Sequence, residues 1–346
     1  MSIFPELLPE TTSGHSTAAL GGQRFRSIDV CAGAGGLALG LEQAGFDPAL
    51  LIDIREQPCE TLRLNRPSWN VRCLDLLDFD PRDHHGLEDI DLLSAGLPRV
   101  QASAASNRSR GSSHELELLM ATVKLAQSLR PRALLIDNVA ELAVAGAYGG
   151  IREQIHDKLA QLGYRYKWFV LNAVDFQVPQ DRKHGFLVAL QGDLIDGFQV
   201  PSPSRQSPPT TGEALLASMA SRGWAHAAEW ARLADKVAPT VVGGSWERGG
   251  ADLGPTGSKR AWARIGVDGG TVADEVPGPD FSWDPSLGRS GMMALTTAQV
   301  ARLQGFPAEW LVAGRKTARY RQVANASPPP LAQAVGEAIV TALAST

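Results

Sequence analysis

Short apolar runs alternate with helix-length stretches over the first half of the chain. The apolar run at residues 26–31 ends in a glycine-rich turn, and an apolar helical pattern follows at residues 37–44. The pattern then repeats, with an apolar run at residues 49–54 and a helical stretch at residues 57–64 that stops before Pro67. Each repeat predicts a strand, a loop and a helix.

Further apolar runs of strand length follow, each separated from the next by a loop or a helix-length stretch. They occupy residues 71–76, 90–94, 133–136, 166–174 and 184–190. Strands that alternate with helices in this way predict a mostly parallel sheet that is covered by helices on both faces. The predicted fold class is therefore α/β, with a doubly wound sheet of the Rossmann type.

The composition and the hydrophobic pattern of the sequence change after Gly192. Proline, serine and threonine are concentrated at residues 201–210, as in a linker, and irregular sequence rich in Gly and Trp follows. Helical patterns return at residues 296–304 and 331–344. We therefore predict a main domain of residues 25–192 and 289–346, and a smaller, loop-rich lobe of residues 193–288.

Composition limits the class of protein. The chain has 346 residues, of which 44% are apolar and 20% are charged, as in ordinary folded proteins. No apolar stretch approaches the roughly 20 residues that a membrane helix requires. Residues 1–23 lack the basic start and apolar block of a secretory signal. We expect a cytoplasmic or nucleoid-associated protein.

The cysteines and the net charge say little about ligands. Cys31, Cys59 and Cys73 lack metal-ligand spacing, so we expect buried, reduced thiols and no metal site. The formal net charge is −4, whereas contacts with phosphate require lysine and arginine. Residues 97–113 nevertheless contain several arginines and no acid. This stretch is either a solvated basic loop or a surface that binds nucleic acid.

The small lobe contains further candidates for nucleic-acid contact. Tryptophans in it have faces that can stack on bases, although tryptophans in a small lobe more often form its core. They are Trp224, Trp230, Trp246 and Trp262. The glycine-rich run at residues 242–257, with Arg248 inside it and Lys259 nearby, is either a recognition loop or an ordinary surface loop.

A glycine-rich loop joins the first predicted strand to the first predicted helix. Residues 29–36 read Asp-Val-Cys-Ala-Gly-Ala-Gly-Gly. Glycines let backbone amides approach a ligand closely, and the start of a helix favours a phosphate or a carboxylate. Asp53, at the end of the second strand, suits a ribose diol, and Asp75, at the end of the third, suits an adenine amino group. The loop by itself is structural as often as it is functional.

At this point the sequence resembles a known family, the cytosine-5 DNA methyltransferases. Residues 29–46 resemble the opening motif of the family, and residues 51–67 resemble its second motif. Residues 135–139, Leu-Ile-Asp-Asn-Val, resemble the Glu-Asn-Val motif. Residues 180–184, Gln-Asp-Arg-Lys-His, resemble the Gln-x-Arg-x-Arg motif.

The resemblance continues near the C-terminus. Residues 301–307, Ala-Arg-Leu-Gln-Gly-Phe-Pro, are nearly identical to the corresponding motif of the family. Residues 325–329, Asn-Ala-Ser-Pro-Pro, resemble the closing Asn-Ala-Val-Pro-Pro, whose helix the family packs beside its first motif. The motifs come in family order, so chance assembly is negligible. The resemblance implies an S-adenosylmethionine-dependent methyltransferase sheet, with the smaller lobe as the target-recognition region.

The resemblance also implies the ligands. The expected cofactor is S-adenosylmethionine or S-adenosylhomocysteine, and the expected partner is double-stranded DNA whose target base is flipped out of the helix. The implied cofactor-binding residues are Cys31, Ala32, Gly33, Gly35, Gly36, Leu37, Asp53, Ile54, Asp75, Leu76, Asn325, Ala326 and Ser327. The candidate DNA-binding residues are Arg108, Arg110, Trp246, Arg248 and Lys259.

The family reaction depends on a cysteine that this chain lacks. In the family, a thiolate adds to carbon 6 of cytosine and a glutamate protonates the ring nitrogen, so that carbon 5 can take the methyl group. Here the corresponding motif reads Gly-Leu-Pro-Arg and places Arg99 after Pro98, where the nucleophile is expected. A guanidinium stays protonated and has no available lone pair, so Arg99 cannot form the adduct.

Neighbouring positions also depart from the family pattern. Asp137 stands at the position of the glutamate and is shorter by one methylene, while His184 replaces the second arginine of the pair that holds the base. The catalytic region carried over from the family comprises Pro98, Arg99, Asp137, Asn138, Gln180, Arg182 and His184.

Three functional hypotheses remain. The leading one is a family member that binds DNA and cofactor but has lost ordinary methyl transfer, and that acts beside a restriction or defence protein. In that case Arg99 either has no chemical role, or binds a phosphate or a base of the DNA. The alternative is an active cytosine-5 methyltransferase or another base-modifying enzyme with a non-standard mechanism, which the retained glycine loop favours. A small-molecule methyltransferase is disfavoured by residues 301–307 and by the second lobe.

Overall fold

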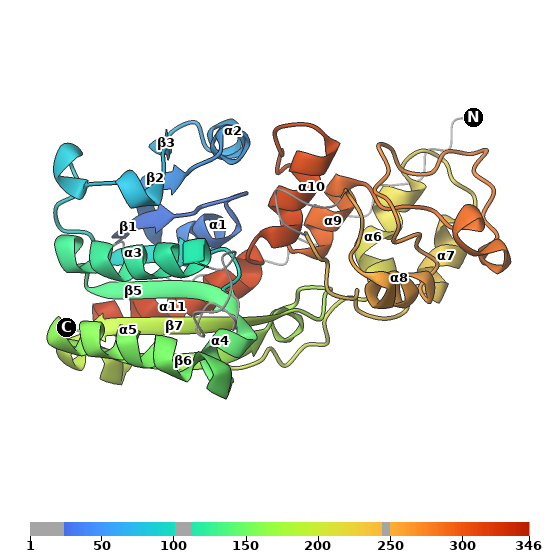
Figure 1. Ribbon diagram of the computed structural model, residues 1–346. Helices are drawn as coiled ribbons and strands as arrows, with labels where there is room; N and C mark the ends of the chain where they lie inside the picture. Colours follow the sequence, from blue (N-terminus) through green and yellow to red (C-terminus); the bar gives the residue numbers. More distant parts are fainter. Residues whose placement is uncertain (1–23, 101–112, 244–249, 346) are drawn as a thin grey trace, which may run out of the picture.

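A seven-stranded sheet forms the centre of the main domain in the computed structural model, which describes residues 24–100, 113–243 and 250–345 (Figure 1). The strands are β1 (Phe25–Val30), β2 (Phe46–Asp53), β3 (Val71–Cys73), β4 (Leu92–Gly96), β5 (Ala133–Val139), β6 (Tyr164–Asn172) and β7 (Lys183–Gln191). Their order is β3-β2-β1-β4-β5-β7-β6. Strand β7 runs antiparallel to β5 and β6, and the other pairs are parallel. The predicted α/β fold with a mostly parallel sheet is confirmed.

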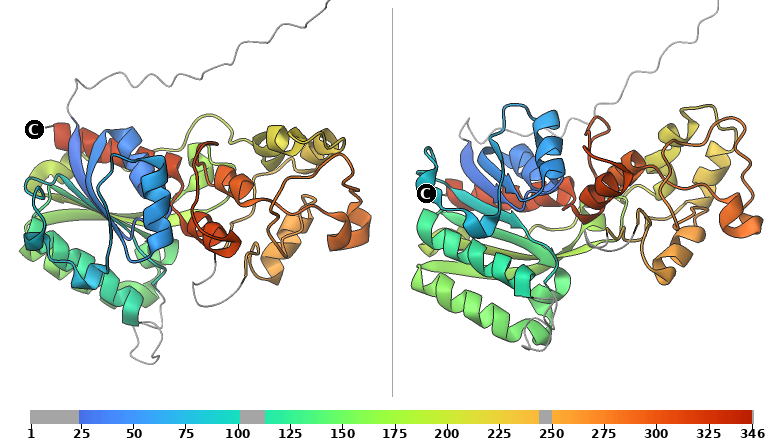
Figure 2. Two further views of the ribbon diagram at one scale, coloured as in Figure 1. Left: turned by 90° about the horizontal axis from the view of Figure 1, so that it is seen from above. Right: turned by 45° about the horizontal axis from the view of Figure 1, so that its top comes forward.

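Helices cover both faces of the sheet (Figures 1 and 2). Helices α1 (Gly36–Ala44), α2 (Glu56–Asn65) and α11 (Pro329–Ala344) lie on one face, and α3 (Ser113–Leu129) and α5 (Gly149–Gln161) lie on the other. The short helix α4 (Ala140–Val144) follows β5 directly. Each face buries its own apolar cluster, so the sheet is sandwiched between two hydrophobic layers.

Small residues allow α11 to lie directly against α1. A Cβ atom built on Gly40 would lie 2.4 Å from the carbonyl oxygen of Pro329, and one built on Gly36 would lie 2.0 Å from that of Ser327. Only glycine permits backbones to come this close. The closing stretch of the chain therefore lies beside the first helix, as expected from the resemblance.

The smaller lobe lies at one end of the sheet, beyond two helices that separate it from the main domain (Figure 1). The lobe contains α6 (Thr211–Ala220), α7 (Ala227–Leu233) and α8 (Thr256–Ala263), and the intervening helices are α9 (Thr297–Leu303) and α10 (Lys316–Asn325). Capping boxes start α6 at Thr210 and α9 at Thr296. Trp230 and Trp262 are completely buried in the lobe, and Trp224 is nearly so. These tryptophans form its core, whereas Trp246 lies outside the described residues.

Several local predictions are corrected by the structure. Strand β3 ends at Cys73, and Asp75 begins a short 3-10 helix, Leu76–Asp78, because its carboxylate accepts from the amide of Leu77. Cys73 is exposed and Cys31 is half-buried, so Cys59 alone is buried, whereas we expected all three thiols to be buried.

The other 3-10 helices are Pro81–Asp83, Gly146–Tyr148, Ala173–Phe176, Gly192–Gly197 and Pro285–Gly291. In the described part of the chain, no helix is both long enough and apolar enough to span a bilayer.

Candidate active site

The site is built where the parallel strands end, at the point in the sheet where the chain order reverses. Strand β1 lies between β2 and β4, so the loops after β1 and β4 leave in opposite directions and a crevice opens between them. Asp29 near the end of β1, Gly96 at the end of β4 and Asp137 in β5 all lie at this edge. The edge therefore brings together the three motifs nearest the predicted chemistry.

The glycine-rich loop after β1 has an unusual backbone conformation. Cys31, Gly33 and Gly35 have φ angles of 55°, 55° and 84°, in the left-handed region. The carboxylate of Asp53 accepts from the amide of Gly33 at 2.9 Å and from that of Arg55 at 2.9 Å. Asp53 thus ties the loop to the end of β2, next to the exposed side chain of Ile54.

Asp29 carries a buried carboxylate oxygen that lacks a partner. Ser94 Oγ donates to Oδ1 of Asp29 at 2.8 Å, while Oδ2 has no hydrogen-bond partner among the described residues. Burial raises the pKa of Asp29 to about 7, against the lowering effect of Ser94. A cationic group bound beside the loop would satisfy this oxygen. The expected cofactor carries an ammonium group, so the residues present fit it.

Asp137 is the centre of a buried hydrogen-bond network. Nδ1 of His184 lies 2.8 Å from Oδ1 and 3.1 Å from Oδ2 of Asp137, and Oγ of Ser327 donates to Oδ2. Arg182 Nε donates to Nε2 of His184 at 3.0 Å. Because Nε2 accepts from Arg182, Nδ1 is the nitrogen of His184 that donates to Asp137. Both carboxylate oxygens are therefore engaged, and Asp137 is only 3% exposed.

Arg182 ties this network to α10 and to the segment that contains Val241. Its Nη1 donates to the carbonyl of Val241 at 2.9 Å and to that of Ala324 at 2.8 Å. Burial lowers the pKa of Arg182 to about 10, while the charge of Asp137 acts in the opposite direction. The guanidinium remains protonated at neutral pH and fixes the position of His184.

Asn138 fixes the loop that follows β4. Its Nδ2 donates to the carbonyl of Pro98 at 3.0 Å, and its Oδ1 accepts from the amide of Val100 at 3.2 Å. Tyr148 also donates through its hydroxyl to the carbonyl of Val100 at 3.0 Å. The exposed side chain of Arg99 therefore projects from a short segment that is anchored on both sides. Tyr148, which the sequence did not single out, is part of this anchor.

Gln180 joins two segments that lie far apart in the chain. It is completely buried; its Nε2 donates to Oε1 of Gln304 at 2.9 Å, and its Oε1 accepts from the amide of Val241 at 3.0 Å. These bonds link the segment just before β7 to the end of α9 and to the segment that follows α7. Gln180 and Arg182 thus both bind Val241, through its amide and its carbonyl respectively.

The remaining predicted cofactor residues divide into two groups. Ala32, Leu37, Leu76 and Ala326 are buried and support the loop by packing. Asn325 is exposed at the end of α10 and lies against Gly243, where a Cβ atom would come 2.3 Å from its Oδ1. Ser327 meets Asp137 directly. The sequence placed it with the cofactor residues because its distance from Asp137 along the chain hides the contact.

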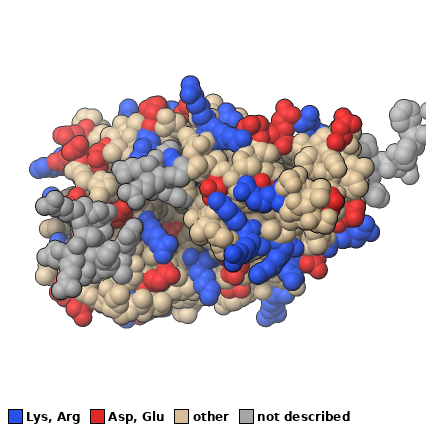
Figure 3. Space-filling model, turned by 45° about the vertical axis from the view of Figure 1, so that its right-hand side comes forward, with Lys and Arg blue, Asp and Glu red and all other residues tan. Residues whose placement is uncertain are grey.

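The predicted DNA-binding residues are only partly described. Arg108, Arg110, Trp246 and Arg248 lie outside the described residues. Lys259 is described and pairs with Asp252 at 3.3 Å. Figure 3 shows Lys and Arg side chains gathered in the middle of one face of the molecule, beside a hollow. The face is thus more basic than the net charge suggests.

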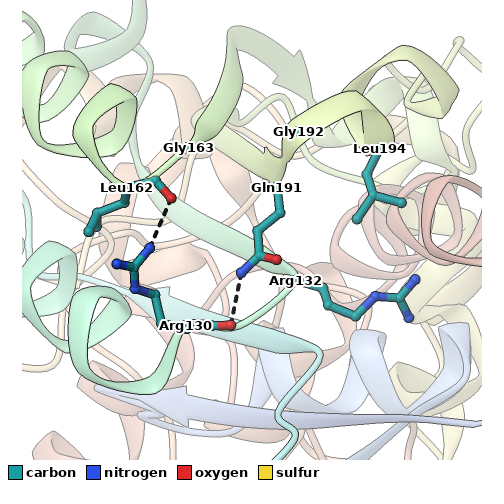
Figure 4. Close-up of a pocket in the computed structure, with 7 residues that line it drawn as sticks. All are labelled: Arg130, Arg132, Leu162, Gly163, Gln191, Gly192 and Leu194. Atoms are coloured by element: carbon teal, nitrogen blue, oxygen red, sulfur yellow. Dashed lines mark hydrogen bonds between the residues drawn. The ribbon is translucent and has the colours of Figure 1, made fainter.

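A separate hollow lies at the opposite edge of the sheet (Figure 4). It has a volume of about 620 Å³ and is lined by Arg130, Arg132 and Gln191, among others. Arg130 donates to the carbonyl of Leu162 at 3.1 Å, and Gln191 donates to that of Arg130 at 3.0 Å. These polar groups join loops at the starts of β5 and β6, far from the strand ends that carry Asp137.

The fold is shared with solved methyltransferase structures. The Entamoeba histolytica methyltransferase EhMeth aligns with a TM-score of 0.65 at 12% identity, over 93% of this chain and 99% of that one. The S. pombe Dnmt2 methyltransferase aligns with a TM-score of 0.60 at 17% identity, over 93% and 99% of the two chains. These matches support the mixed α/β methyltransferase architecture.

Sequence comparison is more specific. The chain is 42% identical to the type II methyltransferase M.NaeI of Lentzea aerocolonigenes, over 93% of this chain and 76% of the relative. It is 37% identical to the type II methyltransferase M.NgoMIV of Neisseria gonorrhoeae, over 92% and 98%. The family model described as C-5 cytosine-specific DNA methylase matches residues 25–341. The chain therefore belongs to the C-5 cytosine-specific DNA methylase family.

Proposed function

We propose that this protein binds duplex DNA and S-adenosylmethionine as part of a type II restriction–modification system, and that its ordinary methyl transfer to cytosine is lost or strongly impaired. The C-5 cytosine methylases use S-adenosylmethionine as methyl donor. The observation that carries the proposal is Arg99, which follows Gly-Leu-Pro where the family nucleophile is expected. Residues 193–288 are proposed as the target-recognition lobe, and a restriction or defence protein as a partner at the nucleoid.

The side chain of Arg99 excludes the covalent step. Addition to carbon 6 requires a lone pair on a nucleophile, and the guanidinium offers none at any physiological pH. The anchors that Asn138 and Tyr148 provide on the flanking backbone hold the loop in place. A different residue is therefore not expected to replace Arg99 by a shift of this segment.

The three cysteines do not supply the missing thiolate. Burial raises the pKa of the Cys31 thiol far above its ordinary range, and the nearby Asp53 and Asp29 raise it further. Burial likewise raises the pKa of Cys59 to about 12. Cys73 lies at the end of β3, near Ile54. Because the thiolate is the reactive form, these groups are poor nucleophiles at neutral pH.

The proton-donating position is also altered in a way that supports the proposal. The carboxylate of Asp137 is engaged by His184 and by Ser327, and is nearly inaccessible. Reaching the ring nitrogen of a flipped base would require these hydrogen bonds to break. Breaking bonds to a buried carboxylate leaves a costly unpaired group.

Arg99 is suited to a different task, which is to hold DNA. Its planar fork matches a phosphate or can stack on a base, and its side chain is exposed on a segment whose backbone Asn138 binds. Exposed arginines at α8 of the lobe and at α9 and α10 beside it extend the basic character of the molecule: Arg260, Arg264, Arg302, Arg315 and Arg319. A wall of this kind supports binding that depends on phosphate contacts.

Methylation and binding assays on the full chain test the proposal separately. We expect S-adenosylhomocysteine binding by calorimetry and duplex binding by gel shift. We expect no transfer of label from tritiated S-adenosylmethionine to cytosine-containing genomic DNA. M.NgoMIV, assayed on the same DNA, provides the positive control. Normal turnover would refute the proposed loss of methyl transfer and favour the alternative of an active enzyme. The glycine-rich loop and the unpartnered Oδ2 of Asp29 would then bind the cofactor of that enzyme.

A further inference from the structure

We propose that Cys59 and Cys73 form a reversible intrachain disulfide on reaction with a low-molecular-weight disulfide, and that this bond weakens cofactor binding at the adjoining end of β2. The first part stands on the geometry of the two thiols. The second part rests on the proposed binding of S-adenosylmethionine at Asp53. The two parts have different readouts and can fail separately.

The two thiols lie beside the ends of β2 and β3. Sγ of Cys59, on α2, lies 3.5 Å from the carbonyl oxygen of Asp53, and Sγ of Cys73 lies 3.5 Å from that of Ile54. Sγ of Cys59 also lies 3.7 Å from the carbonyl oxygen of Arg72, the residue that precedes Cys73. In the sheet register, Cys73 is the partner of Asp53. The pair thus bridges a helix and a strand beside the predicted ribose-binding carboxylate.

Accessibility sets the order of the reaction. Cys73 is exposed, whereas Cys59 is completely buried. The thiolate of Cys73 attacks one sulfur of the external disulfide and expels the first small thiolate. The thiolate of Cys59 then attacks Sγ of Cys73 and expels the second. The protein loses two protons and two electrons, and the external disulfide is reduced to two thiols.

The surroundings of the pair slow its reaction with an oxidant. Burial raises the pKa of Cys59, with Asp53 raising it further and Arg63 lowering it. The pKa of Cys73 is raised by desolvation and by a hydrogen bond with Glu56. Low thiolate populations make exchange slow at neutral pH, so the pair responds to sustained oxidation.

Formation of the bond would disturb the cofactor side of the strand. A disulfide has no S–H groups, so the carbonyls of Asp53 and Ile54 lose the donors that Cys59 and Cys73 now provide. Asp53 also holds the amide of Gly33 through its carboxylate. A shift at the end of β2 is therefore passed directly to the glycine-rich loop.

Peptide mapping tests the disulfide itself. The full-length protein is treated with glutathione disulfide, free thiols are alkylated, and the protease digest is analysed by mass spectrometry. We expect a Cys59–Cys73 crosslinked peptide in the wild type and in Cys31→Ser, and none in Cys73→Ser. A glutathione adduct on Cys73 with Cys59 still open to alkylation after unfolding would overturn the proposal.

Calorimetry with S-adenosylhomocysteine tests the coupling. We expect binding to weaken at least about fivefold on oxidation of the wild type, and to recover with a reductant. Oxidised Cys73→Ser, which keeps the buried thiol, should bind as the reduced protein does. Equal affinity of the oxidised and reduced wild type would refute the coupling. Absence of binding to the reduced protein would instead refute the proposed cofactor function, and the mapped disulfide would stand.

Discussion

Asp137 and His184 form a buried pair across the neighbouring strands β5 and β7, with Nδ1 of His184 2.8 Å from Oδ1 of Asp137. The resemblance places a glutamate and an arginine at these positions in the family. Here both side chains are shorter, and they form a hydrogen bond with each other inside the protein. The two replacements therefore act as a unit, because either one alone would leave a buried polar group without this partner.

We expect the nucleophile alone to be insufficient for restoring activity. Arg99→Cys supplies a thiol, but the carboxylate of Asp137 stays bound to His184 and Ser327. Adding Asp137→Glu and His184→Arg should raise methylation of genomic DNA by at least about a hundredfold over Arg99→Cys, the range of a general acid. Incorporation of tritiated methyl groups measures the effect.

The matched control for this restoration is Arg99→Ser with the same two additional changes. It should remain inactive and should form no denaturant-stable adduct on DNA that contains 5-fluorocytosine, whereas the cysteine variant should form one. If the wild type forms that adduct, the assignment of Arg99 to the nucleophile position is wrong.

Removing the charge of Arg99 should weaken DNA binding. In Arg99→Ala the exposed guanidinium is lost, and with it one phosphate contact. We expect lower affinity for all duplexes and a salt dependence whose log–log slope decreases by about 1. Fluorescence anisotropy at several salt concentrations measures both quantities. Arg165→Ala, which lies at the start of β6 and pairs with Asp196, should leave both unchanged; equal effects of the two variants would argue against a DNA contact by Arg99.

The contact between α1 and α11 predicts a strong dependence on glycine. In Gly40→Ala, the new Cβ would lie 2.4 Å from the carbonyl oxygen of Pro329 and 2.6 Å from Cβ of Ala332. We expect the free energy of unfolding in urea to fall by about 1–3 kcal/mol, as in overpacked cores. Gly150→Ala on α5 meets no atom within 4 Å and should be neutral, or stabilising by less than about 1 kcal/mol. Equal stability of the two variants would show that the helices can separate freely.

The buried carboxyl of Asp29 predicts a specific dependence of stability on pH. Folding raises its pKa from 3.8 to about 7, so between these values the folded state binds a proton that the unfolded state has released. The free energy of unfolding should therefore fall as pH rises through this window, by up to about 1.4 kcal/mol per pH unit. Asp29→Asn should lack this contribution. Parallel pH profiles of the wild type and the variant, measured by urea unfolding, would contradict it.

Local patterns decided much of the architecture. The apolar runs specify β1 and β2, and the left-handed angles at Gly33 and Gly35 show why the loop between β1 and α1 is rich in glycine. Helix α10 escaped prediction because its sequence, Lys-Thr-Ala-Arg-Tyr-Arg-Gln-Val-Ala-Asn, is mostly polar; it buries Tyr320, Val323 and Ala324 together with the polar Arg321 and Gln322. Burial by neighbouring helices overrode its polar composition.

The sequence by itself determined the family, the glycine loop and the arginine at position 99, because each of these depends on residue types at short spacing. Only the tertiary structure decided that Ser327 reaches Asp137, that the thiols of Cys59 and Cys73 both lie beside the end of β2, and that Oδ2 of Asp29 is left without a partner among the described residues. The reason is physical. Such contacts join segments far apart in the chain, and they depend on which strands become neighbours and on how closely α11 returns to α1.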